Sequence, residues 1–476
     1  MKPLFLNPPS FEDFDGGAGA RYQASREVTS FWYPIWLCYP AAMIEGSRVV
    51  DAPVQKLTLE DCLAIARGFD MVVMYTSTPT LKIDIETARR IKVQKPETLI
   101  VLTGPHVTIL PEESLRAGKD IIDIVCRGEF DYAVKELCEG QPWDELQGIS
   151  FLRNDRVVHT ADRPILTDLD ALPFVAPIYK RDLAISEYVI PHFKSPYVAI
   201  YTSRGCPAKC TFCLWPQTYS GQKMRIRSPQ SVYEEVKWIK ENLPEIKDIS
   251  FDDDTFSADK KHARTISELI KPLGVSWVIN ARANCDYETL KIMRDAGLHH
   301  VIVGFESGNE QILKNIKKGV TKQQAIQFVK DCKKLGITIH GAFIMGLPGE
   351  TRETIQETIS YAKMLDLDSI QVSLASPYPG TEFYEQCKRE GWISSDAYID
   401  DTGHQMCMIN YPHLSNAEIF KAVEDFYNKF YFRPKFILRS IGRMIVDSAE
   451  RKKLLKEGKQ YLAYMRKRKE SCSDSK

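Results

Sequence analysis

The chain has 476 residues, too many for one ordinary hydrophobic core, so several domains are expected. Hydrophobic residues make up 44% and charged residues 26%, a balance that excludes a mostly disordered or collagen-like chain. Lysine plus arginine and aspartate plus glutamate both number 63, so no global charge draws the chain to nucleic acid. No apolar run is long enough for a transmembrane helix, and the first residues do not read as a signal peptide.

The first 145 residues alternate short apolar runs with helical patterns. Strands are expected at 2–9, 48–53, 69–78, 98–106 and 120–129. This alternation predicts a parallel, doubly wound sheet, in which ligands lie beyond the C-terminal strand ends. The residues at those ends leave room for a large planar ligand, although ordinary loop chemistry explains them equally well. They are Thr76, Ser77, Thr78, Gly104, His106, Gly128 and Glu129.

Two further segments follow. Residues 146–197 are rich in proline and aspartate, with a hairpin expected at 149–160, and predict a linker between domains. From 198 to 410 a second α/β repeat predicts a partial (β/α)6 barrel with its chemistry at the C-terminal strand ends. Its strands are expected at 198–204, 248–254, 275–282, 300–307, 338–346 and 369–377.

Three of the twelve cysteines are crowded in the stretch TSRGCPAKCTFCLWP, as Cys206, Cys210 and Cys213. Such crowding in a chain without an export signal indicates metal or redox chemistry in a reducing compartment. Three thiolates on one loop can bind three irons of a four-iron four-sulfur cluster and leave the fourth iron open to a ligand.

Two alternatives to the cluster are compatible with the sequence. A structural zinc site usually needs four ligands, so His192 or Cys285 would have to join the three cysteines through the fold. The other alternative is three unrelated buried cysteines.

The spacing CxxxCxxC after the first barrel strand resembles that of the radical S-adenosylmethionine (SAM) superfamily. Matching stretches follow in the family's order: FDDDTF (251–256), GFESGNE (304–310), IMGLPGET (344–351) and SPYPGTEFY (376–384). Together with the N-terminal sheet, residues 1–410 resemble the class with a cobalamin-binding domain. The resemblance implies an α/β fold: a Rossmann-like domain of the cobalamin-binding type, a partial radical SAM barrel and a helical C-terminal region at 411–476.

The resemblance also implies a reaction. Cys206, Cys210 and Cys213 would ligate the cluster, and the open iron would bind the amino and carboxylate groups of SAM. An electron from the cluster, supplied by a reductase or a flavodoxin-type donor, would cleave SAM to methionine and a 5′-deoxyadenosyl radical.

The same resemblance gives roles to residues around SAM. Phe212 matches an aromatic residue near the adenine, with loop packing as its plainer alternative. Asp253 and Asp254 lie where the family binds the cofactor amine, and Asp252 is expected to be solvated. Arg282 would pair with the methionyl carboxylate.

Four more residues complete this set. Glu306 and Ser307 match the contact to the ribose or the methionyl group, with helix capping as the alternative for Glu306. Gly346 and Gly349 would allow close backbone approach to the adenine, or would simply be turn residues.

The N-terminal domain departs from one cobalamin pattern, because the motif DxHxxG is absent and His106 follows TGP. The resemblance still implies cobalamin as a candidate cofactor, and the missing motif implies that no protein histidine holds its lower face. The alternative is a domain that has lost cobalamin and shapes the substrate pocket.

The stretches 7–24 and 30–53 resemble the hopanoid-biosynthesis radical proteins, of the bacteriohopanetetrol cyclitol ether synthase type. This resemblance implies a lipid substrate whose amino-sugar head group undergoes ring contraction. Two alternatives are a cobalamin-dependent radical methyltransferase acting on another lipid or small molecule, and a non-catalytic iron–sulfur or cobalamin sensor.

The C-terminal stretch is strongly basic, with 14 Lys/Arg against 4 Asp/Glu in residues 426–470. Its helical pattern predicts contact with an anionic membrane surface, or packing on the barrel with a solvated basic end. Nucleic-acid binding is not expected. We expect a cytoplasmic protein, or one peripheral to the inner face of a membrane. The apolar residues of this pattern are Phe436, Ile437, Leu438, Ile441, Met444, Ile445, Leu454, Leu455, Tyr461, Leu462 and Met465.

Overall fold

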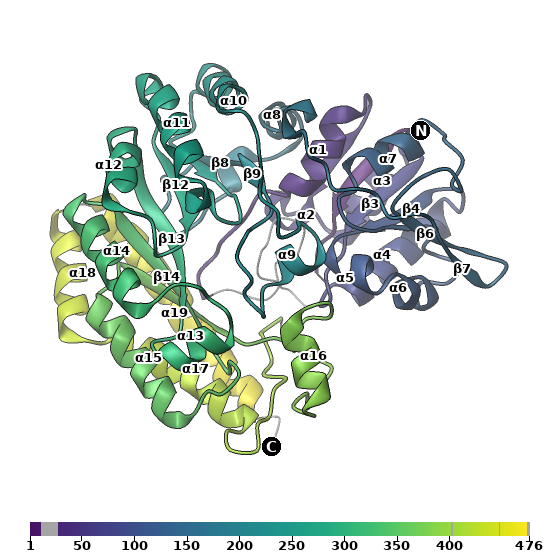
Figure 1. The fold of residues 1–476 in the computed structure, drawn as a ribbon. Helices are drawn as coiled ribbons and strands as arrows, with labels where there is room; N and C mark the ends of the chain where they lie inside the picture. The colour runs from purple at the N-terminus through teal and green to yellow at the C-terminus, as the bar shows by residue number, and fades with distance from the viewer. Residues whose placement is uncertain (11–26, 401–402, 447, 474–476) are drawn as a thin grey trace.

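The computed structural model describes residues 1–10, 27–400, 403–446 and 448–473. They form two large β-sheets with helices packed on them, one in the N-terminal third and one in the middle of the chain (Figure 1). The α/β architecture predicted from the sequence is therefore confirmed. Most of the stretch 7–24, on which part of the family resemblance rests, lies outside the described residues.

The first sheet has the strand order β2-β1-β3-β4-β5-β6-β7. Its first five strands are parallel, and the order 2-1-3-4-5 is that of a flavodoxin-like doubly wound sheet. Alternate residues of one strand enter different cores, Leu4 and Leu6 on one face and Phe5 on the other. The strands are β1 (Pro3–Asn7), β2 (Arg48–Asp51), β3 (Met71–Tyr75), β4 (Leu99–Thr103), β5 (Ile124–Cys126), β6 (Ile149–Arg153) and β7 (Arg156–His159).

Helices cover both faces of this sheet, which is why its parallel strands are largely apolar and buried. One helix was not expected from the sequence: α1 is buried along most of its length and contacts the first sheet as well as α8, which belongs to the following segment. The helices of this part are α1 (Ile35–Met43), α2 (Ala52–Gln55), α3 (Leu59–Ala66), α4 (Leu81–Gln94), α5 (Pro105–Ile109), α6 (Pro111–Ala117), α7 (Asp131–Cys138) and α8 (Ala176–Asp182).

The hairpin expected at 149–160 forms as β6 and β7, but it does not link domains. Strand β6 pairs antiparallel with β5, so the hairpin extends the first sheet. The physical reason is that Phe151 is buried in the core, with its ring edge-on to Trp143, which fixes the register of the hairpin against Ile124. The segment 146–197 is thus not only a linker.

The second sheet has six parallel strands in chain order, from β8 at one edge to β15 at the other. This arrangement is the partial barrel predicted from the sequence, with a short two-stranded sheet of β9 and β10 after β8. The strands are β8 (Tyr197–Ile200), β9 (Ser203–Arg204), β10 (Arg225–Ile226), β11 (Asp248–Phe251), β12 (Trp277–Ala281), β13 (Leu298–Glu306), β14 (Thr338–Met345) and β15 (Ser369–Leu374).

Amphipathic helices follow the barrel strands and cover their outer side (Figure 1). Capping boxes at Thr321, Thr351 and Ser415 fix the starts of α14, α15 and α17, because each hydroxyl accepts from a backbone N–H of the first turn. The helices are α9 (Leu214–Thr218), α10 (Pro229–Asn242), α11 (Lys260–Ile270), α12 (Tyr287–Asp295), α13 (Glu310–Asn315), α14 (Lys322–Lys334), α15 (Arg352–Leu365), α16 (Glu382–Arg389) and α17 (Asn416–Tyr431).

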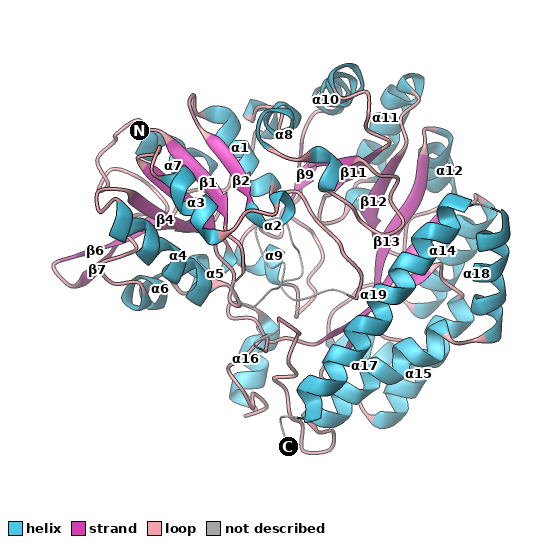
Figure 2. Cartoon of the chain, turned by 180° about the vertical axis from the view of Figure 1, so that it is seen from behind, coloured by secondary structure: helices cyan, strands magenta, loops and turns pink. Residues whose placement is uncertain are grey.

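The basic C-terminal stretch forms two helices, α18 (Pro434–Val446) and α19 (Ser448–Ser473), rather than one. They lie beside α17 (Figure 2), where the ring of Tyr461 packs edge-on against Tyr427 and Tyr431, each at 5.9 Å between centroids. The stretch therefore packs on the barrel. No helix in the described ranges is both long and apolar enough to cross a bilayer. The side chain of Met465 lies outside the described part.

Candidate active site

A cavity of about 330 Å³ opens at the C-terminal ends of the barrel strands. Cys206, Cys210 and Cys213 all line it, so the three crowded thiols face one space. Four further residues predicted around SAM also line this cavity, and they come from different strand ends or from the cysteine loop. They are Phe212, Asp254, Arg282 and Glu306.

The backbone before Cys206 is shaped by a glycine. Gly205 has a φ of +88°, and a Cβ added to it would lie 2.6 Å from the carbonyl oxygen of Lys223. Only glycine fits both that conformation and that contact. Because of this turn, the Cys206 amide can donate to the carbonyl of Gly221 at 3.2 Å. This hydrogen bond holds the cysteine loop against the segment that follows α9.

Gln217 is the main polar anchor of the cysteine loop. Its amide nitrogen Nε2 donates to the carbonyls of Cys210, Thr211 and Cys213 at 3.0, 3.1 and 2.9 Å. Its Oε1 accepts from the backbone amide of Glu382 at 2.8 Å, at the start of α16. One side chain thus fixes the loop and joins it to the last part of the barrel.

We expect Gln217→Glu to release iron from reconstituted protein about tenfold faster, because a carboxylate cannot donate to three carbonyls and leaves them unsatisfied. The measurement is the rate of iron transfer to a chelator under anaerobic conditions. Gln230→Glu makes the same change on the exposed side of α10, where Gln230 donates only to Glu234, and serves as the matched control. Equal release rates in the two variants would show that Gln217 does not hold the loop.

The donor set fits an iron–sulfur cluster. Burial raises the pKa of the Cys213 thiol well above its ordinary value, and the negative charges of Cys210, Asp254 and Cys206 raise it further. Three thiolates in one buried space need cations to offset that charge, which iron supplies. In the described residues no three His, Cys, Asp or Glu side chains converge on the position of a single metal ion. A four-iron cluster does not require such convergence, because its cysteines bind different irons.

Glu306 and Lys318 form a buried ion pair in the cavity, with 2.7 Å between Nζ and Oε1. Burial lowers the pKa of Lys318, but Glu306 and Cys210 outweigh it, so the net pKa is above its usual range. Glu306 has a φ of +63°, and the β13–β14 register shifts between Gly304 and Glu306. Such backbone strain in a non-glycine residue is typical of functional sites, and here it directs Glu306 into the cavity.

Arg282 follows β12 and lies between the cysteine loop and this ion pair. Its Nη1 is 3.9 Å from Cys210 Sγ, and its Nη2 donates to the carbonyl of Lys318. Its backbone amide donates to Ser257 Oγ at 3.3 Å. The guanidinium is therefore held beside the thiols, where it can pair with an anion in the cavity.

Asp253 does not line the cavity, contrary to the sequence-based expectation. It is fully buried and accepts from the backbone amides of Thr202 and Ser203 at 2.6 and 3.2 Å and from both hydroxyls. Asp253 therefore fixes the chain just before the cysteine loop.

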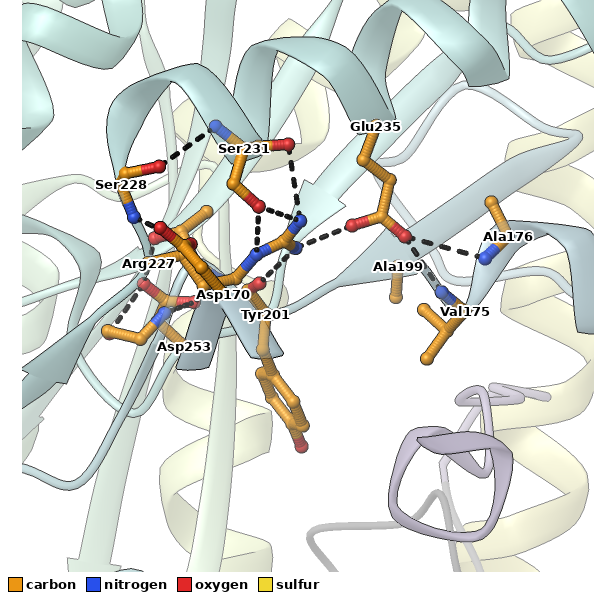
Figure 3. Close-up of polar contacts among 12 residues, drawn as sticks. Asp170, Val175, Ala176, Ala199, Tyr201, Arg227, Ser228, Ser231, Glu235 and Asp253 are labelled. Carbon is orange, nitrogen blue, oxygen red and sulfur yellow. Dashed lines mark hydrogen bonds and ion pairs between the residues drawn. The ribbon is translucent and has the colours of Figure 1, made fainter. Parts of the chain in front are cut away.

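Arg227 supports the same region. Figure 3 shows its guanidinium donating to the carbonyl of Tyr201, at 3.0 Å, and pairing with Glu235. Glu235 in turn accepts from the amide of Val175 at 2.9 Å. This network ties α10, the end of β8 and the segment before α8 together beneath the cysteine loop.

The structure corrects the expectation for Asp252, and it places three other predicted SAM contacts outside the cavity lining. Asp252 is buried rather than solvated and accepts from Asn280 Nδ2 at 3.0 Å. Ser307, Gly346 and Gly349 do not line the cavity. The Ser307 hydroxyl lies 3.2 Å from that of Thr358. Gly346 and Gly349 have φ values of +92° and +84°, so local turn geometry already accounts for both glycines.

The residues predicted at the strand ends of the first sheet do gather after β3, β4 and β5. His106 is buried, and its Nδ1 lies 3.1 Å from Thr78 Oγ1, while its Nε2 has no hydrogen-bond partner among the described residues. Burial lowers the pKa of His106 to about 4, so the imidazole is neutral. A buried ring nitrogen without a partner fits a face that a polar cofactor covers.

Glu129, at the end of β5, lies between two buried arginines. Its Oε2 accepts from Arg225 Nη1 at 2.7 Å and from the Leu166 amide at 2.8 Å, and Arg204 lies 3.4 Å from its Oε1. Burial would raise the pKa of Glu129, yet the charges of Arg204 and Arg225 hold it below its usual value. Glu129 thus joins the first sheet to the cysteine loop through Oε2, while its buried Oε1 has no hydrogen-bond partner among the described residues.

The two predicted ligand faces adjoin each other. Helix α9, which begins directly after Cys213, packs against α5 at the end of β4. The ring of Trp215 in α9 stacks on that of Tyr75 at the end of β3, with 6.3 Å between centroids. The cysteine cavity and the strand ends of the first sheet are therefore neighbours in one site.

Sequence reasoning missed Gln217, Lys318 and Arg204. Their roles depend on partners that no motif marks, such as three carbonyls for Gln217 and a glutamate on another element for Lys318. Only the proximity of Gln217 to the cysteine triplet in the sequence offered a signal.

Two family models match the chain. The radical SAM superfamily matches residues 200–362, which span the cysteine loop and most of the barrel. The B12 binding domain matches residues 24–138, which span most of the first sheet. The cofactors predicted from the sequence, a [4Fe–4S] cluster, SAM and cobalamin, are those that the two families imply.

Three relatives named as methyltransferases or as a methylase are similar to this chain. An uncharacterized methyltransferase of Pyrococcus horikoshii is 34% identical over 453 residues, covering 93% of this chain and 95% of that protein. The cytidylyl-2-hydroxyethylphosphonate methyltransferase of Streptomyces wedmorensis is 30% identical over 364 residues, covering 68% and 67%. A hopanoid C-3 methylase of Methylococcus capsulatus is 26% identical over 319 residues, covering 64% of this chain and 58% of that protein.

A solved structure shares the fold. The radical SAM methyltransferase TsrM of Kitasatospora setae, solved with cobalamin and a [4Fe–4S] cluster, superposes with a TM-score of 0.68 and 16% identity, covering 98% of this chain and all of that one. The family matches, the Pyrococcus relative and the shared fold agree with the three-cysteine cavity beside a doubly wound sheet. The chain belongs to the radical SAM superfamily of enzymes, in the group that carries an N-terminal B12-binding domain.

Proposed function

We propose that the chain is a cobalamin-dependent radical SAM methyltransferase. The observation that carries this proposal is the contact of α9 with α5, because it brings the cysteine cavity next to the strand ends of the B12-binding domain. When bound, the cluster and SAM supply a carbon radical, and cobalamin supplies a methyl group. A substrate between the two would meet both.

The chain's own residues position these groups. Cys206, Cys210 and Cys213 hold the cluster, and Arg282 pairs with the methionyl carboxylate of SAM. Asp254 lines the same cavity and attracts the methionyl ammonium.

Two more residues complete the SAM contacts in this proposal. Phe212 packs on the adenine. Glu306, held by Lys318, accepts from the ribose hydroxyls. The thiols and the charged groups lie in a cavity recessed between the strand ends, which keeps water from the reacting carbon.

Methyl transfer fits the relatives better than ring contraction. The relatives reported above are named as methyltransferases or as a methylase, whereas the ring contraction rests on the first 55 residues alone. A bacteriohopanetetrol-type lipid stays a candidate methyl acceptor, and a reductase or flavodoxin-type electron donor stays a prediction. The SAM contacts are proposals too, as are the cobalamin contacts of Thr76, Ser77, Thr78, Gly104, His106, Gly128 and Glu129.

The test uses full-length protein reconstituted anaerobically with iron, sulfide and cobalamin. It is incubated with dithionite, SAM labelled in its methyl group, and a lipid extract of the native host. We expect labelled methyl in one lipid species, together with S-adenosylhomocysteine and 5′-deoxyadenosine. A new lipid without label would support ring contraction instead. A full cluster that yields no 5′-deoxyadenosine would favour a sensor.

A further inference from the structure

A second cavity, of about 450 Å³, lies at the opposite end of the barrel, where the strands begin. The first residues of β13, β14 and β15 form one wall, and the helix pair α18–α19 forms another. Its size is typical of cavities that hold a small organic ligand. The lining is mostly apolar and includes Trp32, Ile370, Phe436, Met444, Leu454 and Tyr461.

The mouth of this lower cavity is apolar and exposed. Phe432, Leu455 and Leu462 line the cavity and yet are 57%, 55% and 60% exposed. On the outer side of α18, Leu438 and Ile445 are 69% and 76% exposed. So many exposed large apolar side chains on one pair of helices indicate a surface that meets an apolar partner.

Cations accompany these apolar residues. Arg451, Lys452, Lys456 and Lys459 occupy exposed positions of α19, within the stretch that carries 14 Lys/Arg against 4 Asp/Glu. Exposed apolar side chains together with clustered cations are the pattern of a helix that rests on an anionic bilayer. The cavity mouth opens on that same surface.

The two cavities adjoin each other inside the barrel. Asn280, Ile302 and Gln371 line both of them. Helix α19 also borders both, with Leu454 at the lower cavity and Tyr464 at the cysteine cavity. These two residues are separated by about 15 Å along the helix at its ordinary rise. An elongated molecule in the lower cavity would need to pass only these shared side chains to reach the cysteine cavity.

We infer that the lower cavity binds the apolar body of a lipid that the chain takes from an anionic membrane surface. This inference rests on the proposed function, because the lipid bound there would be the methyl acceptor. Its polar end would lie along the barrel axis, and the carbon that is methylated would lie beside SAM.

Three histidines lie together on the cavity floor. The rings of His192 and His300 stack at 5.7 Å, and that of His340 lies 6.0 Å from His192. Burial lowers the pKa of His192 and His300 well below the ordinary value, so these imidazoles are neutral. A hydroxyl holds His300 in place, since its Nδ1 lies 2.7 Å from Thr338 Oγ1.

Two helix glycines provide a matched pair of variants. Gly458 lines the lower cavity and Gly442 does not, and a Cβ added to either meets no atom within 4 Å. Neither has a positive φ, so phenylalanine strains neither backbone and improves both helices. The probe is cis-parinaric acid, a polyene fatty acid whose fluorescence rises in apolar surroundings. It is titrated into full-length protein with its cluster reconstituted.

We expect wild-type protein and Gly442→Phe to bind the probe equally, and Gly458→Phe to bind it about tenfold more weakly, a change of about 1.4 kcal/mol. No binding by the wild type, or equal binding by both variants, would overturn the inference. If the wild type binds the probe but transfers no methyl group, the proposed function fails and the cavity assignment stands. If the wild type transfers a methyl group but does not bind the probe, the cavity assignment fails and the proposed function stands.

Vesicles test the source of the lipid. We expect the wild type to sediment with phosphatidylglycerol vesicles and not with phosphatidylcholine vesicles. Leu438→Glu, on the exposed side of α18, should lower that sedimentation and leave the affinity for free cis-parinaric acid unchanged. Equal binding to both kinds of vesicle, or to neither, would overturn the membrane source.

Discussion

Cys210→Ala is expected to abolish reductive cleavage of SAM, with a loss on the order of a thousandfold or more in 5′-deoxyadenosine formation. Cys210 lines the cavity with Cys206 and Cys213, and its carbonyl is one of those that Gln217 holds. Two thiolates cannot hold three irons, so the variant should also retain much less iron and sulfide after reconstitution. Iron, sulfide and 5′-deoxyadenosine are measured on the same anaerobic samples.

Cys332→Ala is the matched control for this experiment. Cys332 is a buried thiol on α14, away from the cavity, and burial raises its pKa well above the ordinary value, so it is inert. The control should keep its iron content and its turnover. A Cys210→Ala protein with full iron content and SAM cleavage would remove Cys210 from the cluster and the open-iron mechanism with it.

The sheets could be predicted because short segments rich in apolar residues alternate with helical patterns along the chain. What could not be predicted depends on contacts between distant segments. The hairpin of β6 and β7 was expected, but its pairing with β5 was not, since nothing local marks Phe151 as a core residue. Helix α1 was missed because it is apolar on all sides and shows no helical periodicity.

The residues of the site also divide into those that the sequence could predict and those that it could not. The cysteines were identified because their spacing reflects a local constraint, three ligands on one loop. Asp253 and Asp254 are adjacent in the sequence and of the same type, yet one is bound to Thr202 and Ser203 while the other lines the cavity. Which of two neighbouring carboxylates points inward is decided by the backbone after β11, and sequence alone does not give that direction.

The second large effect concerns Arg204, the residue two positions before Cys206. Its guanidinium donates to both oxygens of Asp131, at 2.8 and 3.0 Å, and lies 4.4 Å from the ring centroid of Trp36. Asp131 is the first residue of helix α7 in the B12-binding domain, so this buried pair joins that domain to the cysteine loop. Arg204→Met leaves a buried carboxylate without its partner, which costs about 3–5 kcal/mol of unfolding free energy.

Urea unfolding followed by circular dichroism measures the loss. Lys291→Met removes an exposed pair with Asp295 on α12 and should leave stability close to that of the wild type. The double variant Arg204→Met, Asp131→Leu should recover much of the loss, because no uncompensated charge remains at Asp131. If the single and double variants were equally unstable, packing against Trp36 rather than charge would account for the effect.

The dependence on pH separates these causes further. In the folded chain the pKa of Glu129 lies below its ordinary 4.5, with Arg204 the largest of the charges that lower it against burial. The stability that this depressed pKa contributes is therefore complete above pH 4.5 and is lost as pH falls through the folded value. Removing Arg204 raises the folded pKa of Glu129, so the free energy of unfolding of Arg204→Met should depend less on pH below 4.5 than that of the wild type. An unchanged dependence on pH would show that Arg225 alone keeps Glu129 charged.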